Sequence, residues 1–153
     1  MGLFGFSRQL IGALFCMMAL AGCQTLGGSG LIASSAYSGL SPEAANAIAG
    51  DMVGRLAEHV GPGTTTIQLT PDGSIFGQTL EHSLKGWGYA VVTDQQAEGT
   101  NIVPLAYVVD TFDNDLLARL STESLTLTRI YTITSTGATP SSPLSVMTTG
   151  QGG

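Results

Sequence analysis

The chain has few charged residues and very few basic ones. Asp, Glu, Lys and Arg make up 10% of its 153 residues, against roughly 25% in typical soluble domains. Only five Lys and Arg stand against 11 Asp and Glu, a formal charge of −6. Nucleic acids are bound by clustered basic side chains, so we expect no direct nucleic-acid contact. The hydrophobic content of 43% is too ordinary for a transporter with several membrane spans.

Cysteine is also scarce, and both copies lie near the N-terminus. Residues 1–8 carry one positive charge and no acid, and the apolar run in residues 9–20 is shorter than the roughly 20 residues that span a bilayer. Such a run is typical of a signal peptide. Leu20, Ala21 and Gly22 then lead to Cys23, an order that resembles the lipobox of bacterial lipoproteins. We interpret residues 1–22 as a lipoprotein signal peptide and Cys23 as the lipid attachment residue; the alternative is an ordinary secretory signal.

Lipid attachment would leave the mature chain without a free thiol. Cys16 would be removed with the signal peptide and Cys23 would carry acyl chains, which excludes disulfides, thiolate nucleophiles and cysteine metal sites. Loss of Arg8 would leave four basic residues against 11 acidic ones, a formal −7. Several acyl chains hold a protein firmly on a membrane. Gln24 after the cysteine resembles the signal for outer-membrane delivery, so we expect an outer-membrane anchor with the domain in the periplasm.

The sequence of the mature chain predicts one small domain between two low-complexity segments. Residues 23–40 are rich in Gly, Ser and Ala and uncharged, which predicts a lipidated flexible tether. The composition of residues 136–153 predicts a low-complexity tail, disordered except for a contact that residues 144–147 could make. Between them, residues 41–135 predict a small single α+β domain, in which two helices pack on one face of a mixed, mainly antiparallel sheet.

Local patterns define the elements of this domain. Ser41, Pro42 and Glu43 form a helix start, and apolar residues at three- and four-residue steps continue to residue 60. Helical periodicity also covers residues 75–85. Strands are predicted at residues 64–70, 89–93, 102–112, 116–120 and 125–134. In the last hairpin we expect Leu120 opposite Leu125, Ala118 opposite Leu127, and Leu116 opposite Arg129.

A search for catalytic templates finds none of the common ones. The chain lacks a Gly-x-Ser-x-Gly elbow, Ser-x-x-Lys, His-Glu-x-x-His and a phosphate-binding glycine loop. We therefore expect a protein that is not an enzyme, with no cofactor, metal or small-molecule substrate. His59 and His82 would form a two-histidine metal site only if the helices met at those residues; surface or capping roles are favoured.

Four polar residues remain ambiguous. Asp110, Asp113 and Asp115 suggest a calcium loop, but Leu117 occupies a ligand position and the EF-hand glycine is missing. A solvated turn is favoured. Arg129 lies on the apolar face of its strand, where it either pairs with one of these aspartates or marks a contact with a partner.

Two aromatic residues also have two interpretations. Trp87 and Tyr89 follow the second predicted helix closely. They form either a binding patch or a helix end that closes over the core, and the second is the commoner arrangement.

Several blocks along the chain, taken together, resemble one family. They are the lipobox at residues 20–23, ANAIAGDMVGRLAEHV at residues 45–60, residues 76–91, PLAYVVD at residues 104–110, and residues 125–131 with Arg129. The order of these blocks along the chain resembles their order in the TrbH family of conjugal transfer lipoproteins. The resemblance implies a plasmid-encoded part of a Trb-type type IV secretion apparatus for mating-pair formation, anchoring or stabilising the channel beside TrbG-like and TrbI-like subunits. The family's motifs are structural, so Cys23 alone is carried over as a functional residue. The alternative is a lipid-anchored periplasmic enzyme or small-ligand module unrelated to conjugation.

Overall fold

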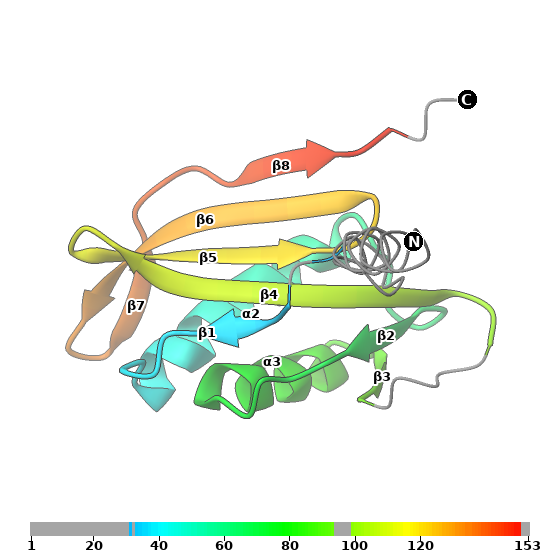
Figure 1. Cartoon of the computed structure of the whole chain (residues 1–153), viewed down its shortest axis with the longest axis horizontal. Coiled ribbons are helices and arrows are strands. Elements are labelled where there is room, and N and C mark those ends of the chain that lie inside the picture. The colour runs from blue at the N-terminus through cyan, green and yellow to red at the C-terminus, as the bar shows by residue number, and fades with distance from the viewer. Residues whose placement is uncertain (1–30, 32, 94–98, 151–153) are drawn as a thin grey trace, which may run out of the picture.

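The computed structural model describes residues 31, 33–93 and 99–150. Within them it contains two helices and eight strands (Figure 1). The helices are α2 (Pro42–Ala57) and α3 (Ile75–Gly86). The strands are β1 (Ser35–Ala36), β2 (Thr66–Leu69), β3 (Ala90–Val92), β4 (Ile102–Phe112), β5 (Asp115–Ser121), β6 (Leu125–Thr134), β7 (Gly137–Pro140) and β8 (Ser145–Thr148).

Both helices begin at a serine that caps a free amide. Ser41 Oγ accepts a hydrogen bond from the Ala44 amide at 3.2 Å, and Ser74 Oγ accepts one from the Gly77 amide at 3.0 Å. Side-chain caps of this kind satisfy amides that have no partner within the helix. The predicted start of the first helix is confirmed, but α2 ends at Ala57, three residues earlier than predicted.

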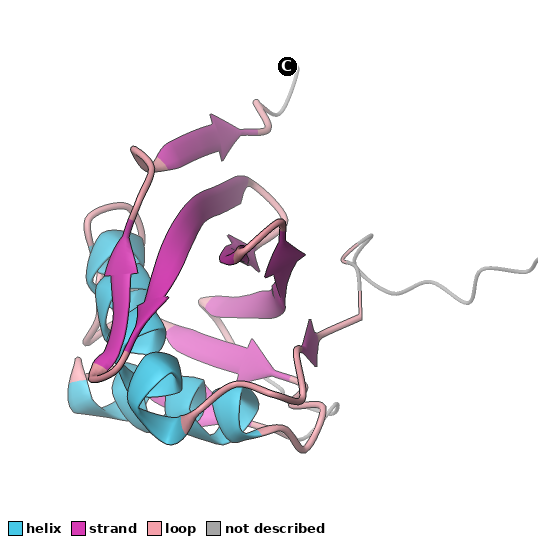
Figure 2. Cartoon of the chain, turned by 90° about the vertical axis from the view of Figure 1, so that its left-hand side faces the viewer, coloured by secondary structure: helices cyan, strands magenta, loops and turns pink. Residues whose placement is uncertain are grey.

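The strands form one mixed sheet in the order β3-β2-β4-β5-β6-β7. β2 runs parallel to β3 and β4, while β4, β5, β6 and β7 are joined by antiparallel pairing. The short strand β1 also pairs with β4, and β8 pairs with β6. Both helices lie on one side of this curved sheet (Figure 2). The predicted α+β class and its layering are confirmed.

The folded region extends beyond both predicted boundaries. Residues 137–148, predicted as largely disordered, contain β7 and β8, which pair with the two halves of β6. The disorder prediction is wrong there, because the free edge of β6 offers amides and carbonyls that two short, low-complexity strands can satisfy. Gly137 has φ +147° and lies so close to α2 that a Cβ would be 3.2 Å from the Glu43 carbonyl oxygen. At the other end, β1 and the buried Leu40 place the last part of the predicted tether in the domain.

The predicted register of the β5–β6 hairpin is wrong by two residues. Leu120 lies opposite Leu127 and Ala118 opposite Arg129. The prediction left four residues in the turn, whereas the Thr122 amide donates to the Leu125 carbonyl at 2.7 Å and shortens it. Thr122 Oγ1 also accepts from the Leu125 amide at 3.0 Å. Since the shift is an even number, each side chain keeps its predicted face of the sheet.

One apolar core fills the space between the helices and the sheet. Alternate residues of three strands point into it, as the pleat of a strand requires. They are Leu105, Tyr107 and Val109 of β4, Leu116, Ala118 and Leu120 of β5, and Leu125, Leu127 and Tyr131 of β6. The largest fully buried side chains of this core include Tyr107, Tyr131 and Phe76, and the rings of Phe76 and Tyr107 meet edge to face with centroids 5.3 Å apart.

Candidate functional site

The predicted lipid attachment residue, Cys23, lies outside the described residues. Its role therefore stays a prediction. In the described part of the chain, no helix has the length and apolar character needed to cross a membrane.

The two histidines lie at separate places on the surface. His59 follows the last turn of α2, and His82 lies in the middle of α3; both are exposed. Among the described residues, no group of three or more His, Cys, Asp and Glu side chains is placed to hold a metal ion.

The three aspartates that were considered as a calcium loop have separate positions and contacts. Asp113 occupies the tight β4–β5 turn with φ 53°, a backbone conformation that Asp adopts more readily than most residues. Asp110 Oδ1 accepts from the Thr111 amide at 2.7 Å, and Asp115 Oδ1 accepts from the Thr132 hydroxyl at 2.9 Å. These carboxylates stabilise a turn and the adjoining strand end, in agreement with the favoured interpretation.

Trp87 and Tyr89 do not share a patch. Tyr89 is 4% exposed, and its hydroxyl donates to the Val60 carbonyl; burial raises the pKa of this phenol. Trp87 is 49% exposed and its ring lies over Gly54, where an added Cβ would be 3.2 Å away. Tyr89 closes the core as favoured, while Trp87 covers the neighbouring helix.

Arg129 pairs with a helix residue and not with the predicted aspartates. Its Nη1 lies 2.9 Å from Oδ2 of Asp51 in α2, and its Nε donates to the Ser142 carbonyl at 3.1 Å. The Tyr131 hydroxyl donates to the same Asp51 oxygen at 2.6 Å. The prediction named the wrong partners because the register that places Arg129 over α2 depends on the short turn at Thr122. The cluster joins α2, β6 and the β7–β8 connection.

The electrostatics of this cluster indicate a structural role. The side chains of Arg129 and Asp51 are 17% and 23% exposed, so their attraction is less screened than on the surface. Burial raises the pKa of Tyr131, and the hydrogen bond and charge of Asp51 raise it further. A phenol whose pKa is raised in this way stays protonated near neutral pH, so it cannot act there as a base.

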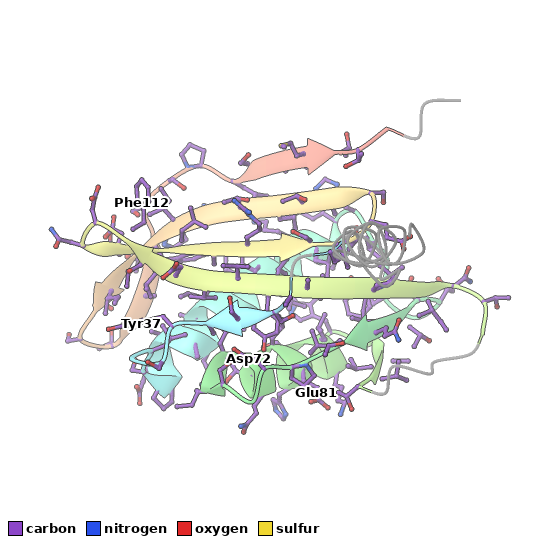
Figure 3. All side chains as sticks on the ribbon, viewed as in Figure 1. Tyr37, Asp72, Glu81 and Phe112 are labelled. Atoms are coloured by element: carbon purple, nitrogen blue, oxygen red, sulfur yellow. The ribbon has the colours of Figure 1, made fainter. Side chains whose placement is uncertain are left out.

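A second polar cluster was not predicted from the sequence. Asp72 lies between β1 and the first turn of α3 (Figure 3). Its carboxylate accepts from the Ala36 amide at 2.9 Å, the Ser74 amide at 3.0 Å and the Tyr107 hydroxyl at 2.5 Å. Burial opposes ionisation, but the hydrogen bonds from Ser74, Tyr107 and Ala36 outweigh it and hold the pKa of Asp72 below its usual value. Asp72 thus fastens β1 to the helix-covered side of the domain.

The side of the sheet that faces away from the helices is less covered. We call it the outer face and define it by two rungs of aligned residues on β4, β5 and β6: Val108, Arg119 and Thr128, followed by Asp110, Leu117 and Ile130. All of these are half-buried except Asp110, which is exposed. Phe112, at the end of β4 (Figure 3), is 49% exposed.

Arg119 stands out on the outer face because none of the ion pairs among the described residues includes it. The ion pairs found in the described residues involve the other three basic side chains, Arg55, Lys85 and Arg129. Nε of Arg119 is buried and has no hydrogen-bond partner within the described part of the chain. Arg119 was not among the residues predicted from the sequence. The signal for it is the alternation of β5, which places Arg119 on the other face of the strand from the core residues Ala118 and Leu120.

Comparisons with known proteins point to one family. Residues 26–150 match the family model described as conjugal transfer protein TrbH. The chain is similar to a "Probable conjugal transfer protein TrbH" of Sinorhizobium fredii, with 47% identity over 145 residues that cover 92% of this chain and 97% of that protein. No solved structure matches the chain.

Proposed function

The chain belongs to the TrbH family of conjugal transfer proteins, and we propose that it is a lipid-anchored, non-enzymatic component of the conjugation apparatus. In this proposal Cys23 carries the acyl chains in the outer membrane. The domain extends into the periplasm, where it binds and stabilises the mating channel beside TrbG-like and TrbI-like subunits.

The observation that carries the proposal is the order of residues 1–23. A basic start, a short apolar run and small residues before Cys23 are the elements of a lipoprotein signal. The short length of chain that follows supports an anchored domain, because only 12 residues run from Cys23 to Ser34 and a flexible coil of that length would span on the order of 20 Å. The domain would therefore act close to the membrane surface.

The polar clusters support a structural role over a catalytic one. On the core side of the sheet, the Asp51 carboxylate accepts hydrogen bonds from Arg129 and Tyr131. The Asp72 carboxylate accepts hydrogen bonds from backbone amides and from the Tyr107 hydroxyl. The Ser74 hydroxyl does donate to Asp72 Oδ1 at 2.5 Å, but the same hydroxyl oxygen caps α3 by accepting from the Gly77 amide. In neither cluster of the described residues is a hydroxyl paired with a base and free of a structural role, as a catalytic nucleophile would be.

Replacing Cys23 by Ser tests the anchor directly. In donor cells that carry the complete transfer region, Cys23→Ser should block acylation, leave the precursor uncut and release the protein from the outer-membrane fraction. Plasmid transfer should fall by at least about tenfold, since loss of several buried acyl chains removes membrane binding. Cys16→Ser is the matched control, because it removes the other thiol without touching the lipobox.

Mass spectrometry of the mature N-terminus decides the outcome. An unmodified Cys23, or a precursor cut elsewhere, would refute the anchor. Unchanged transfer by Cys23→Ser would refute its role in conjugation. Alanine at His59, His82, Asp110 and Asp113 should leave transfer unchanged, whereas a loss at these residues would favour an enzyme or a ligand-binding module.

A further inference from the structure

We propose that the outer face binds a partner protein through Arg119, which pairs with a carboxylate presented among apolar side chains of that partner. The inference deepens the proposed function and rests on it, since the partner would belong to the same apparatus. It concerns a surface that the lipid anchor does not involve.

The first support is the unmet hydrogen-bonding capacity of Arg119. A guanidinium carries five N–H donors and is always charged. Its Nε is buried and unpaired in the described part of the chain, and a buried donor without an acceptor costs about 1–3 kcal/mol. A carboxylate of a partner would supply a counterion for the guanidinium and accept hydrogen bonds from its terminal nitrogens.

The second support is the setting of this charge. Val108 and Thr128 lie beside Arg119 on the neighbouring strands, and Leu117 lies next to it on the same face of β5. These side chains are half-buried. A partner that covered them would exclude water from around the ion pair, and charge pairs within such contacts are worth far more than exposed ones.

Charge and sequence favour a partner protein over other occupants. Residues 1–42 contain no Asp or Glu, so the chain's own N-terminal segment cannot supply the carboxylate. The mature chain carries a formal −7, which disfavours an anionic lipid surface. The same excess would repel a strongly acidic partner, so we expect one carboxylate on a largely apolar segment.

Asp110 is the nearest internal candidate by register. It lies on the next rung, diagonal to Arg119, where long side chains can reach one another. Its Oδ1 instead accepts from the Thr111 amide, and no ion pair joins it to Arg119 among the described residues.

Site-specific crosslinking in donor cells tests the proposal on the full lipoprotein. A photoreactive benzoylphenylalanine replaces Leu117 on the outer face or, as the control, Gln78 on the exposed side of α3. Irradiation should join position 117 to a protein of the transfer region. The crosslinked peptide should contain Asp, Glu or a C-terminal carboxylate, and position 78 should give at least about fivefold less of this product.

Variants of Arg119 make the test specific for charge. Arg119→Gln should weaken the crosslink and lower plasmid transfer by roughly tenfold or more, because it leaves the partner's carboxylate unpaired. Arg119→Lys should retain part of both signals. Arg55→Gln, which removes a cation paired on the helix side, should leave both unchanged. Exchange of charge, with Arg119→Glu and an arginine at the identified carboxylate, should restore transfer.

Several results would overturn the proposal. One is a crosslink from position 117 to this chain's own residues, to a second copy of the chain or to lipid. The others are a crosslinked product that forms equally well without Arg119, and the absence of any product at position 117. If Arg119→Gln does not accumulate, the crosslink at position 117 in the otherwise unchanged chain, with the identity of the peptide, still decides. If Arg119→Gln transfers the plasmid normally while Cys23→Ser does not, this surface is rejected and the anchor is kept. If Cys23→Ser transfers normally while Arg119→Gln does not, the anchor is rejected.

Discussion

The two faces of the same sheet differ in whether their arginine side chain has a counterion. On the helix-covered face, Arg129 has Asp51 as counterion and the Ser142 carbonyl as a further acceptor. On the outer face, Arg119 has neither within the described residues. The first face is complete by itself, and its polar groups contribute to folding. The second carries a charge that has no counterion in the described part of the chain, in line with the proposed contact with another protein.

The largest expected effect comes from breaking the completed face at Asp51. Asp51→Asn leaves the Arg129 guanidinium without a counterion, and it weakens the hydrogen bond from Tyr131. Loss of one partner of a buried pair costs 3–5 kcal/mol, and since both side chains are partly exposed we expect about 2–4 kcal/mol. Urea unfolding measures the change.

Asp110→Asn is the matched control for that experiment. It removes the same charge from the outer face, where Asp110 is exposed, and should alter the free energy of unfolding by less than about 0.5 kcal/mol. Equal losses from both variants would mean that the two faces do not differ in this way.

Packing on the helix-covered face gives the next effect. A Cβ on Gly77 would lie 2.3 Å from the Tyr107 hydroxyl oxygen, which is fixed by Asp72. Gly77→Ala must therefore displace β4 or the start of α3, at a cost of about 1–3 kcal/mol. Gly50→Ala in α2 meets no atom within 4 Å and should stabilise the protein by about 0.5–1 kcal/mol through helix propensity. Thermal unfolding of both variants separates contact from propensity, and a stabilising Gly77→Ala would contradict the packing.

The helix-covered face was largely predictable from the sequence because it follows periodicity. The apolar steps of α2, the capping residue Ser41 and the apolar run of residues 102–112 each report a local preference. The partner of Arg129 was not predictable, since it depends on a turn shortened by the Thr122 side chain. The strands of residues 137–148 were missed because their pairing with β6, and not their composition, stabilises them.

Arg119 provides a smaller effect, with the opposite sign. Arg119→Met removes a buried donor that has no acceptor while keeping the apolar stem of the side chain. We expect the free energy of unfolding to stay the same or to rise by up to about 1 kcal/mol. Urea unfolding beside Asp51→Asn checks this, and a loss comparable with that variant would show that Arg119 already has an internal partner.

The smallest effect is the loss of stability in acid through Asp72. Its pKa is lower in the folded state than in the unfolded chain, because Ser74, Tyr107 and Ala36 donate to the carboxylate. The unfolded state therefore takes up a proton first as the pH falls, and the contribution of Asp72 is present above pH of about 4 and is lost below it. Asp72 is exposed, so we expect only about 0.5–1 kcal/mol. The Asp72→Asn variant should be less stable than the unchanged protein at pH 6, and this difference should shrink as the pH falls below about 4 and the carboxylate takes up a proton. A difference that persisted in acid would mean that Asp72 acts through shape and not through charge, and that β1 is held to the helix-covered face by packing alone.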